Sequence, residues 1–580
     1  MVKFNEEKQN QKLEELKKGE AESLTKILSQ KYGLPYVNLN LNPINIEALR
    51  YVKQDEAESA KIAPFNLIGK KIQVGILSPT NPKTLEAVEN LEKKGLEPEL
   101  FMTSEAGLDR VWERYQDLSS SVTSSGGALD VSSEEISNFL NKTSNLESIK
   151  QLIKENLESK ESYRISKILE IMLSGALALK ASDVHLEPEE SYIRLRYRLD
   201  GVLTDVLNFD NVTYDLLLSR LKLLSNLKLN ISGQAQDGRF SIKLREKDIE
   251  IRTSILPGAY NDAVVMRILN PEAIGVPLEE LGIHPKLLKV LLYEISKPNG
   301  MILTTGPTGS GKTTTLYAFL KKIHSPGIKI ITIENPIEYH LPGIVQTQTD
   351  DRAKQSLSKS LRSAFQGGGD QGEGYTFSEG LRSALRQDPD IIMVGEIRDK
   401  ETAEIAINAS LTGHLVFSTL HTNNAAGAFP RLIDLGVNPK VITSALNVVM
   451  AQRLVRRLCV DCKKKIALEG ENKKIIEKIL ETIKDPEYLE GLDTDSIWEP
   501  VGCEKCNHTG FKGRVGIYEA VRSTEKIEEV VEKNPSEREI EEASKEQNIL
   551  NMGQDGVIKA LSGLTSLDEL GRVVNLFEKF

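Results

Sequence analysis

One short segment, residues 306–313, constrains the fold of this chain more than any other. It reads Gly-Pro-Thr-Gly-Ser-Gly-Lys-Thr and fits the pattern G-x-x-x-x-G-K-[ST]. The glycines let backbone N–H groups surround phosphate oxygens, Lys312 can reach the β- and γ-phosphates, and the Thr313 hydroxyl can bind Mg²⁺. Apolar residues 301–305 predict a buried strand before the loop, and residues 314–323 predict a helix after it. We therefore expect a nucleotide triphosphate site; a glycine-rich turn that binds nothing is the alternative.

Length and charge limit the class of protein. The chain has 580 residues and a net charge of -10, which predicts several domains and disfavours a nucleic-acid-binding surface. No apolar run approaches the roughly 18 residues that a membrane-spanning helix needs, and the charged N-terminus lacks the apolar core of a signal peptide. We expect a cytoplasmic protein whose membrane contact is peripheral.

Changes in pattern along the chain predict its division into segments. A mixed α/β region comes first, and a Ser/Gly-rich stretch, typical of a flexible linker, follows it. Short strands come next, then alternating strands and helices as in a parallel sheet, then a cysteine-containing insert and a Glu/Lys-rich helical end. The predicted segments are 1–117, 118–147, 148–275, 276–456, 457–520 and 521–580.

Two further apolar strands end in acidic residues. Residues 390–396 end at Glu396, and residues 330–338 contain Glu334 and Glu338. Carboxylates at the C-terminal ends of parallel strands face the crevice where such sheets bind ligands, so Glu396 is a candidate Walker B residue that orients water or holds Mg²⁺ through water. Gly395 stands where a typical Walker B strand has Asp, so direct Mg²⁺ ligation is not expected there. Solvated loop charges are the alternative for each acid.

Histidines and arginines accompany these strands. His414 and His421 flank an apolar strand and are candidates to sense the γ-phosphate, with a purely structural role as the alternative. Arginines stabilise the charge that phosphoryl transfer spreads over phosphate oxygens, and we expect two or three of those nearby to touch nucleotide. The candidates are Arg382, Arg386, Arg398, Arg431 and Arg453.

A near-repeat lies between the two acidic strands. Residues 357–365 resemble residues 377–385, and a glycine-rich stretch at 366–374, expected to be flexible, separates them. A local tandem duplication explains the similarity; chance recurrence of a Leu/Arg/Ser helical pattern is the alternative.

All four cysteines form two C-x₂-C pairs, Cys459 with Cys462 and Cys503 with Cys506, separated by forty residues. Two such turns can complete a tetrahedral S₄ zinc site, with no open position for catalysis. A disulfide pair is disfavoured in the cytoplasm, and a redox C-x-x-C needs no second copy. We expect a structural zinc that stabilises the insert.

Together these motifs resemble the type II/type IV secretion ATPase superfamily, the PilB and GspE family, and most closely its type IV pilus assembly branch. The resemblance is detailed over about residues 150–520. The other landmarks that carry it are residues 181–188, Gln236 to Arg239, the "Asp box" at 334–339, 381–390, 395–399 and the "His box" at 413–423.

The resemblance implies a multidomain α/β protein with a PAS-like α+β N2 domain, a RecA-like P-loop ATPase domain, an N-terminal α/β (N1) domain and a tetracysteine zinc subdomain. It implies Mg²⁺-dependent hydrolysis of ATP in a homohexamer, with Glu338 activating water, Glu396 as the Walker B glutamate and Lys312 on the phosphates. The implied nucleotide-binding residues are Gly306, Pro307, Thr308, Gly309, Ser310, Gly311, Lys312, Thr313, Thr314, Arg196, Arg220, Arg382, Arg386, Arg398, Arg431, His414 and His421. The implied metal ligands are Cys459, Cys462, Cys503 and Cys506 for Zn²⁺ and Thr313 for Mg²⁺.

Three departures from the family pattern stand out. Asn335 replaces the usual Asp of the Asp box, which leaves a Mg²⁺ role at that position in doubt. The segment 351–374 is longer than the usual connection, and the arginines are assigned to the second copy because it leads directly into residues 390–396. The N-terminal domain lacks a clear Arg-Leu-Gly motif, so cyclic di-GMP binding is not expected.

The resemblance also implies partners: an inner-membrane platform protein of the PilC/GspF type and a cytoplasmic adaptor of the PilM/GspL type, at the inner face of the cytoplasmic membrane. The expected function is assembly of type IV pili. Type II secretion shares every motif and remains the rival. A retraction motor usually lacks the large N-terminal domain and the cysteine insert. A RecA-like nucleic-acid translocase and a non-hydrolysing nucleotide-binding scaffold are the alternatives of other classes.

Overall fold

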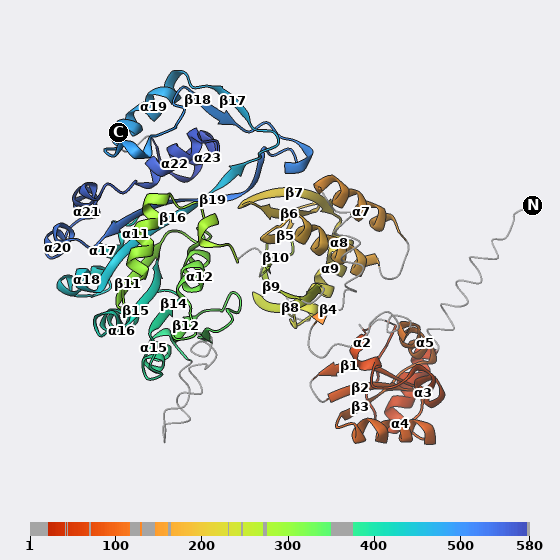
Figure 1. Cartoon of the computed structure of the whole chain (residues 1–580). Coiled ribbons are helices and arrows are strands. Elements are labelled where there is room, and N and C mark those ends of the chain that lie inside the picture. Colours follow the sequence, from red (N-terminus) through yellow and green to blue (C-terminus); the bar gives the residue numbers. More distant parts are fainter. Residues whose placement is uncertain are drawn as a thin grey trace, which may run out of the picture. The chain divides into compact units, whose positions relative to one another are not determined.

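The computed structural model (Figure 1) describes residues 21–40, 42, 44–68, 71–115, 128–129, 145–159, 164–229, 231, 233–244, 247–270, 275–349 and 375–576. The chain forms two compact units, residues 1–130 with 161–163, and residues 131–160 with 164–580. Within the described ranges, no helix has the length and apolar character that crossing a membrane requires. The first copy of the near-repeat, the segment 351–374 and most of the predicted linker lie outside the described residues.

The first unit is a small α/β domain built on a three-stranded sheet of order β1-β2-β3. β1 and β2 are antiparallel, and β2 and β3 are parallel. Val74 of β2 and Leu108 and Trp112 of α5 belong to its core. Polar caps start the helices: the Ser104 hydroxyl accepts the Gly107 N–H at the start of α5. The elements are α2 (Ile46–Leu49), α3 (Gln54–Ala60), β1 (Ile62–Ile68), β2 (Lys71–Ile76), α4 (Pro82–Lys93), β3 (Glu97–Met102) and α5 (Glu105–Glu113), with a short strand β4 (Ala128–Leu129) further along the chain.

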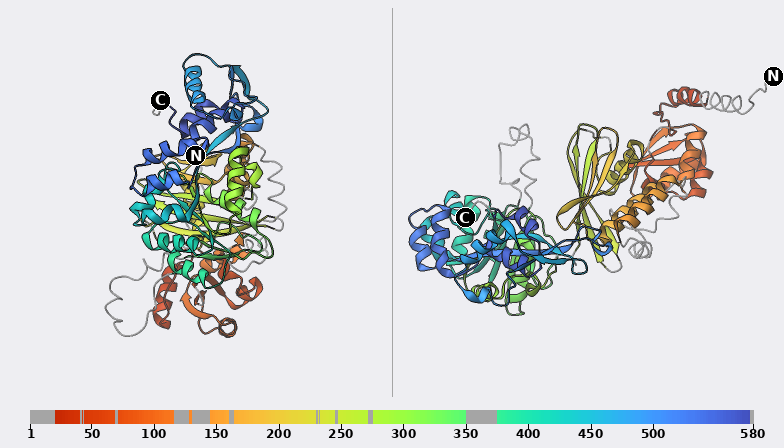
Figure 2. Two further views of the ribbon diagram at one scale, coloured as in Figure 1. Left: turned by 60° about the vertical axis from the view of Figure 1, so that its left-hand side comes forward. Right: turned by 90° about the horizontal axis from the view of Figure 1, so that it is seen from above.

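The second unit begins with an antiparallel sheet whose strands follow the order β8-β9-β10-β5-β6-β7. Burial alternates along β6: Ile193, Leu195 and Tyr197 are buried, and the arginines between them are partly exposed. The Tyr197 hydroxyl donates to the Met172 carbonyl of α8, so helices cover this apolar face (Figure 2). The elements are α7 (Leu146–Glu158), α8 (Arg164–Ala178), β5 (Asp183–Pro188), β6 (Ile193–Leu199), β7 (Val202–Phe209), α9 (Asn211–Leu224), β8 (Gln236–Leu244), β9 (Lys247–Pro257) and β10 (Asp262–Leu269).

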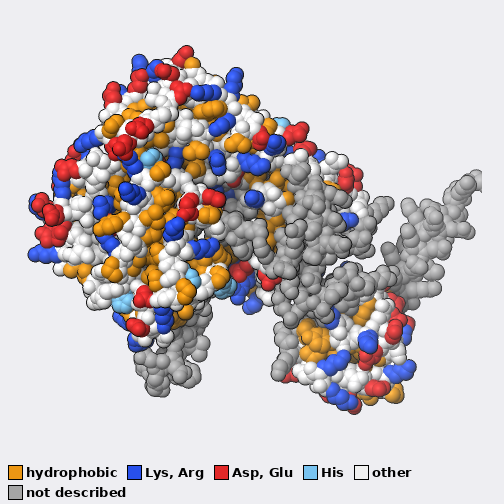
Figure 3. Space-filling view, viewed as in Figure 1, with side chains coloured by type: hydrophobic (Ala, Val, Ile, Leu, Met, Phe, Trp, Pro, Cys, Tyr) orange, Lys and Arg blue, Asp and Glu red, His pale blue; other side chains and the backbone are white. Residues whose placement is uncertain are grey.

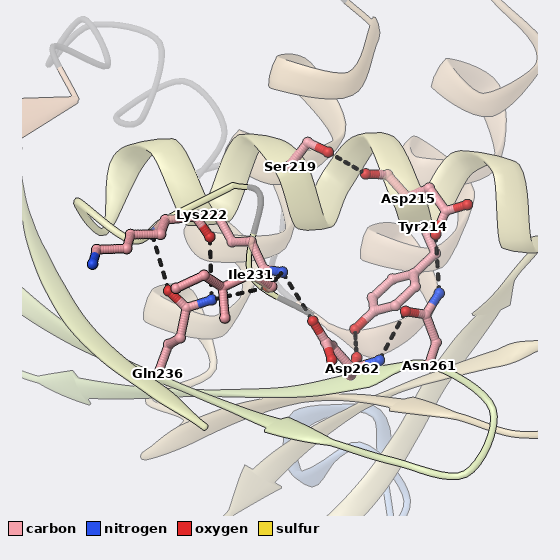
Figure 4. A network of polar contacts seen from close by, with 9 residues as sticks. Tyr214, Asp215, Ser219, Lys222, Ile231, Gln236, Asn261 and Asp262 are labelled. Carbon is pink, nitrogen blue, oxygen red and sulfur yellow. Dashed lines mark hydrogen bonds and ion pairs between the residues drawn. The ribbon is translucent and has the colours of Figure 1, made fainter. Parts of the chain in front are cut away.

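A buried ion pair fixes α9 to this sheet (Figure 4). Lys222 Nζ lies 2.9 Å from Asp262 Oδ2 and donates to the Ile231 carbonyl at 3.2 Å. The Tyr214 hydroxyl, also on α9, donates to the Asp262 carbonyl. The Lys222 and Asp262 side chains are only 6% and 11% exposed, so each charge depends on the other for its compensation.

The second unit continues with a seven-stranded sheet of order β13-β12-β14-β15-β11-β16-β19. All neighbours are parallel except β16 and β19. Every residue of β11, β12, β14 and β15 is buried, as expected for a parallel sheet with both faces covered. One core cluster contains residues of α11 and α12, and another contains residues of α15 to α18. The elements are η2 (Leu278–Glu280), α11 (Pro285–Ile295), β11 (Gly300–Thr305), α12 (Lys312–Ile323), β12 (Ile330–Glu334), β13 (Val345–Gln348), α15 (Phe377–Leu385), β14 (Ile391–Val394), α16 (Lys400–Leu411), β15 (Leu415–Leu420), α17 (Ala428–Asp434), α18 (Pro439–Ala445), β16 (Leu446–Leu458) and β19 (Phe511–Arg522).

An insert between β16 and β19 and the C-terminal helices complete the unit. Lys559 of α22 donates to Asp555 at 2.5 Å and to the Gly516 carbonyl of β19 at 2.7 Å, which joins the C-terminal helices to the sheet. Acidic and basic side chains are intermixed over the visible face of this unit (Figure 3). The elements are β17 (Lys464–Ala467), α19 (Gly470–Glu481), η3 (Pro486–Tyr488), β18 (Ser496–Glu499), η4 (Glu504–Cys506), α20 (Glu525–Val531), α21 (Glu537–Ser544), η5 (Lys545–Gln547), α22 (Met552–Leu561) and α23 (Leu567–Val573). The chain is thus the multidomain α/β protein that the sequence predicts.

Candidate functional site

The glycine-rich loop lies between β11, a central strand of the parallel sheet, and the first turn of α12. Gly306, Gly309 and Gly311 have φ values of 146°, 78° and 89°. A Cβ on Gly311 would lie 2.9 Å from Gln452 Nε2, and that amide donates to the Ser310 carbonyl at 2.6 Å. Gln452 of β16 therefore supports the loop. The loop itself has a conformation that requires glycine.

Lys312 is the first residue of α12 and lies against this loop. Its Nζ donates to the Gly306 carbonyl at 2.7 Å and the Pro307 carbonyl at 3.0 Å. Burial lowers the pKa of Lys312, and the nearby charge of Glu396 opposes that shift. The ammonium and the carboxylate are thus close enough to influence each other.

The strand register brings the predicted acids to the same edge of the sheet as the loop. Ile333 pairs with Val394, and Thr305 pairs with Leu420, so the C-terminal ends of β12, β14, β15 and β11 coincide. Glu396 is 15% exposed; its Oε2 lies 3.3 Å from His421 Nε2, and its Oε1 pairs with Arg398. The Glu396 carboxylate therefore lies between the side chains of His421 and Arg398, at the edge of the sheet where the loop begins.

Glu338 lies in the loop after β12 and contacts the antiparallel sheet of the same unit. Arg252 Nη1 lies 3.7 Å from Glu338 Oε2, and Arg252 Nη2 donates to the Ile337 carbonyl at 3.2 Å. Burial raises the pKa of Glu338, whereas the positive charges of Arg252 and Arg267 lower it. The pKa of the Glu338 carboxyl is thus set by two opposing effects, burial and the positive charge of two guanidinium groups.

The structure places several predicted nucleotide-binding residues elsewhere. His414 precedes β15, at the edge of the sheet opposite to the loop, and its Nδ1 lies 3.1 Å from the Ala409 carbonyl. Arg196 pairs with Glu187 within the antiparallel sheet. Arg220 belongs to α9, which packs on the face of β9 that carries Thr253, opposite to Arg252. These three residues are not brought to the phosphate loop of this chain.

The remaining predicted arginines differ in their surroundings. Arg398 pairs with Glu396, whereas Arg382 pairs with Glu401 at 2.7 Å and lowers the pKa of that carboxyl. Arg386 donates to the Ser383 hydroxyl at 3.1 Å. Arg431 lies on α17, and Arg453 donates to the Val573 carbonyl at 2.7 Å.

Sequence reasoning missed Arg252 and Arg267, the two arginines that face Glu338. A signal was available in the alternation of apolar and charged residues along β9 and β10. Ile249, Ile251 and Ile255 alternate with polar residues, which places Arg252 on the face away from the helices. Arg267 pairs with Arg252 in the strand register, so the same face carries both.

The four cysteines converge at the base of the insert. Their Sγ atoms all lie within 4.8 Å of one another. Three of the separations are 3.9 Å for Cys459 and Cys503, 3.8 Å for Cys462 and Cys506, and 3.7 Å for Cys503 and Cys506. Ligands of a tetrahedral site with Zn–S bonds of about 2.3 Å lie about 3.8 Å apart, so the donor set and its spacing fit zinc.

Comparisons with known proteins identify the family of this chain. A family model described as type II/IV secretion system protein matches residues 158–572, and a MshEN domain model matches residues 32–122. The type IV pilus assembly ATPase PilB of Myxococcus xanthus is 35% identical over 558 residues, which cover 95% of this chain and 91% of that protein. The type II secretion system protein E of Aeromonas hydrophila is 40% identical over 417 residues, 72% of this chain and 77% of that protein.

Among solved structures, the ATPase DotB of Legionella pneumophila aligns at a TM-score of 0.48 and 21% identity, over 72% of this chain and 97% of that chain. The family model alone spans well over half of the sequence, and its range includes the two large sheets of the second unit from β5 onward and the cysteine insert. The resemblance recognised from the motifs is therefore confirmed. The chain belongs to the type II/IV secretion system protein family and is an ATPase of that family.

Proposed function

We propose that this protein is the motor ATPase that assembles type IV pili, coupling Mg²⁺-dependent hydrolysis of ATP to the addition of pilin subunits. The extent of similarity along the chain favours pilus assembly over type II secretion. The pilus assembly ATPase matches 95% of this chain, including the N-terminal region, whereas the type II secretion protein matches 72%. Type II secretion remains the second candidate because that relative has the higher identity, 40% against 35%.

The proposed reaction is an in-line attack of water on the γ-phosphate. Lys312 and the backbone N–H groups of the loop hold the phosphates, and Glu338 orients the water and accepts its proton. Arg252 and Arg267 support this role because their positive charges oppose the rise in the pKa of Glu338 that burial causes. Thr313 is the residue that would hold Mg²⁺, which neutralises phosphate charge, and Glu396 orients water around it.

In the proposed assembly, residues 148–275 form the N2 domain, residues 276–456 the ATPase domain and residues 457–520 the zinc subdomain. The contact of Arg252 with Glu338 and Ile337 joins the first two at the site, so loss of the γ-phosphate would change it and permit a rigid-body motion. Six copies would form the motor at the inner face of the cytoplasmic membrane. A platform protein of the PilC/GspF type and an adaptor of the PilM/GspL type would transmit the motion.

Two experiments test the proposal at different levels. In steady-state assays of the purified full chain, Glu338→Gln should retain ATP binding and lower kcat by about 10²- to 10⁴-fold. In a deletion strain, electron microscopy of surface filaments should show filaments restored by the wild type and not by Lys312→Ala. Filaments that persist while protein export fails would establish type II secretion instead, with the hydrolysis mechanism unchanged.

A further inference from the structure

A buried polar cluster lies beneath the loop that carries Glu338. Its centre is Glu334, the last residue of β12, which is only 2% exposed. Glu334 Oε1 accepts from the Thr332 hydroxyl at 2.6 Å and from Gln346 Nε2 at 3.1 Å, and its Oε2 accepts from the Tyr317 hydroxyl. Among the described contacts these partners are neutral donors, so the carboxylate is held by directed hydrogen bonds.

Tyr317 connects this cluster to the helix that follows the phosphate loop. It is fully buried on α12, the helix that begins at Lys312. Burial and the Glu334 carboxylate raise the pKa of Tyr317, while a hydrogen bond from the Glu338 backbone lowers it. The hydroxyl therefore holds the Glu334 carboxylate, close to the backbone of Glu338. The Tyr317 ring also packs edge-on against Tyr339, with centroids 4.7 Å apart.

Gln346 holds the other end of the same loop. Its Nε2 donates to the Tyr339 carbonyl at 3.1 Å, and its Oε1 accepts the Leu341 N–H at 2.7 Å. The Glu334 carbonyl in turn accepts the Thr349 N–H at 2.8 Å, at the end of β13. The residues that follow Glu338 are thus tied to the Glu334 carboxylate, by the hydrogen bonds of Gln346 and by the contact of the Tyr317 ring with Tyr339.

We propose that Tyr317, Glu334 and Gln346 form a positioning unit that sets the distance between Glu338 and the phosphate loop. The inference rests on the proposed role of Glu338 as the residue that activates water. Because α12 carries both Lys312 and Tyr317, the lysine proposed to bind phosphate and the side chain that contacts Glu334 and Tyr339 move as one body. A displacement of about 1 Å in such a group can lower the rate by about 10²-fold, so these hydrogen bonds are sufficient to control turnover.

The test is Tyr317→Phe in the full chain, which removes the hydroxyl and keeps the ring against Tyr339. We expect kcat to fall by about tenfold or more, with KM for ATP and the affinity for ADP changed by less than about twofold, because phosphate binding does not use the hydroxyl. Tyr197→Phe is the matched control. It also removes one buried hydroxyl, which donates to the Met172 carbonyl in the antiparallel-sheet region, and it should leave kcat unchanged.

A second variant keeps the inference testable if Tyr317→Phe does not fold. Gln346→Leu, on a strand at the edge of the sheet, should show the same loss of kcat at nearly constant KM. The inference is overturned if either variant, folded by circular dichroism, keeps kcat within twofold of the wild type, or if Tyr197→Phe lowers kcat equally. Glu338→Gln separates the two proposals: if it turns over normally, the role of Glu338 is wrong, and if it is inactive while Tyr317→Phe is normal, only the positioning unit is wrong.

Discussion

Arg252 of β9 and Glu338 of the loop after β12 meet between two different sheets, with Nη1 and Oε2 3.7 Å apart. A second contact, from Arg252 Nη2 to the Ile337 carbonyl, fixes the guanidinium against the backbone of the same loop. Burial raises the pKa of Glu338 and the arginines lower it, so ionisation of the carboxyl is favoured by side chains from a sheet other than its own. The same contacts join the loop that carries Glu338 to the antiparallel sheet.

Removal of Arg252 should shift the acid limb of the pH–rate profile. In Arg252→Gln the Glu338 carboxyl loses its nearest positive charge, so its pKa rises further above the ordinary range. Because the proposed base must be ionised, activity is present above that pKa and lost as the pH falls through it, so the acid limb moves to higher pH. We expect kcat at neutral pH to fall by about tenfold or more, measured by steady-state ATPase assays across pH.

The control for this profile is Arg194→Gln. Arg194 lies on β6 of the same sheet and pairs with Glu189 at 3.5 Å and Asp205 at 3.9 Å, away from Glu338. Its pH–rate profile should match that of the wild type. An acid limb that stays in place in Arg252→Gln would contradict the assignment of Glu338 as the base.

Loss of the hydrogen bond from Gln452 to the phosphate loop should raise KM for ATP. Gln452 is 1% exposed, and its amide donates to the Ser310 carbonyl at 2.6 Å. A hydrogen bond of this kind contributes about 0.5–1.5 kcal/mol, so Gln452→Leu should raise KM for ATP by about three- to tenfold. Gln554→Leu, which removes a buried amide that donates to the Thr482 hydroxyl, is the control. Equal KM values for the two variants would show that Gln452 does not hold the loop.

The cysteine cluster should bind zinc and stabilise the insert. Elemental analysis of the purified wild type should find about one zinc per chain, as expected for a closed S₄ site. Cys503→Ser should lose most of it and should unfold at lower temperature, because ligand binding contributes directly to folding of such inserts. Lys505→Gln, beside the cluster and paired with Asp461 at 2.6 Å, should keep its zinc. Retention of zinc by Cys503→Ser, or intramolecular disulfides in the wild type, would refute the assignment.

The buried pair of Lys222 and Asp262 predicts a large single-residue effect on stability. Lys222→Met leaves the Asp262 carboxylate buried without its partner, which costs about 3–5 kcal/mol. The thermal unfolding midpoint of Lys222→Met should therefore fall clearly below that of the wild type. The control Lys228→Met changes an exposed lysine, and its unfolding midpoint should stay close to that of the wild type. The double variant Lys222→Met with Asp262→Leu should recover part of the loss, since it leaves no uncompensated charge. A single variant as stable as the wild type would show that the pair is not buried in solution.

Local motifs were the part of the site that sequence could predict. The phosphate loop and the two C-x₂-C turns are contiguous, and each places its ligand atoms through the geometry of a few neighbouring residues. The position of Glu396 and Glu338 shortly after the ends of strands was also predictable, because parallel strands expose their C-terminal ends at one edge. The burial of Glu334 could not be predicted, because an acid at a strand end does not indicate which side chains will pack around it.

The two histidines show what only the tertiary structure decided. His414 comes directly before β15 and His421 directly after it, and the two ends of a six-residue strand are roughly 20 Å apart. His421 therefore lies at the edge of the sheet that carries the site, and His414 lies at the opposite edge. Arg252 and Gln452 reach the site from strands far along the chain, and their positions depend on the packing of whole sheets. The sequence by itself determined the chemistry of the loop and the metal cluster, because both are local; the tertiary structure decided which charges surround Glu338, because strand register and domain packing join residues that no local pattern relates.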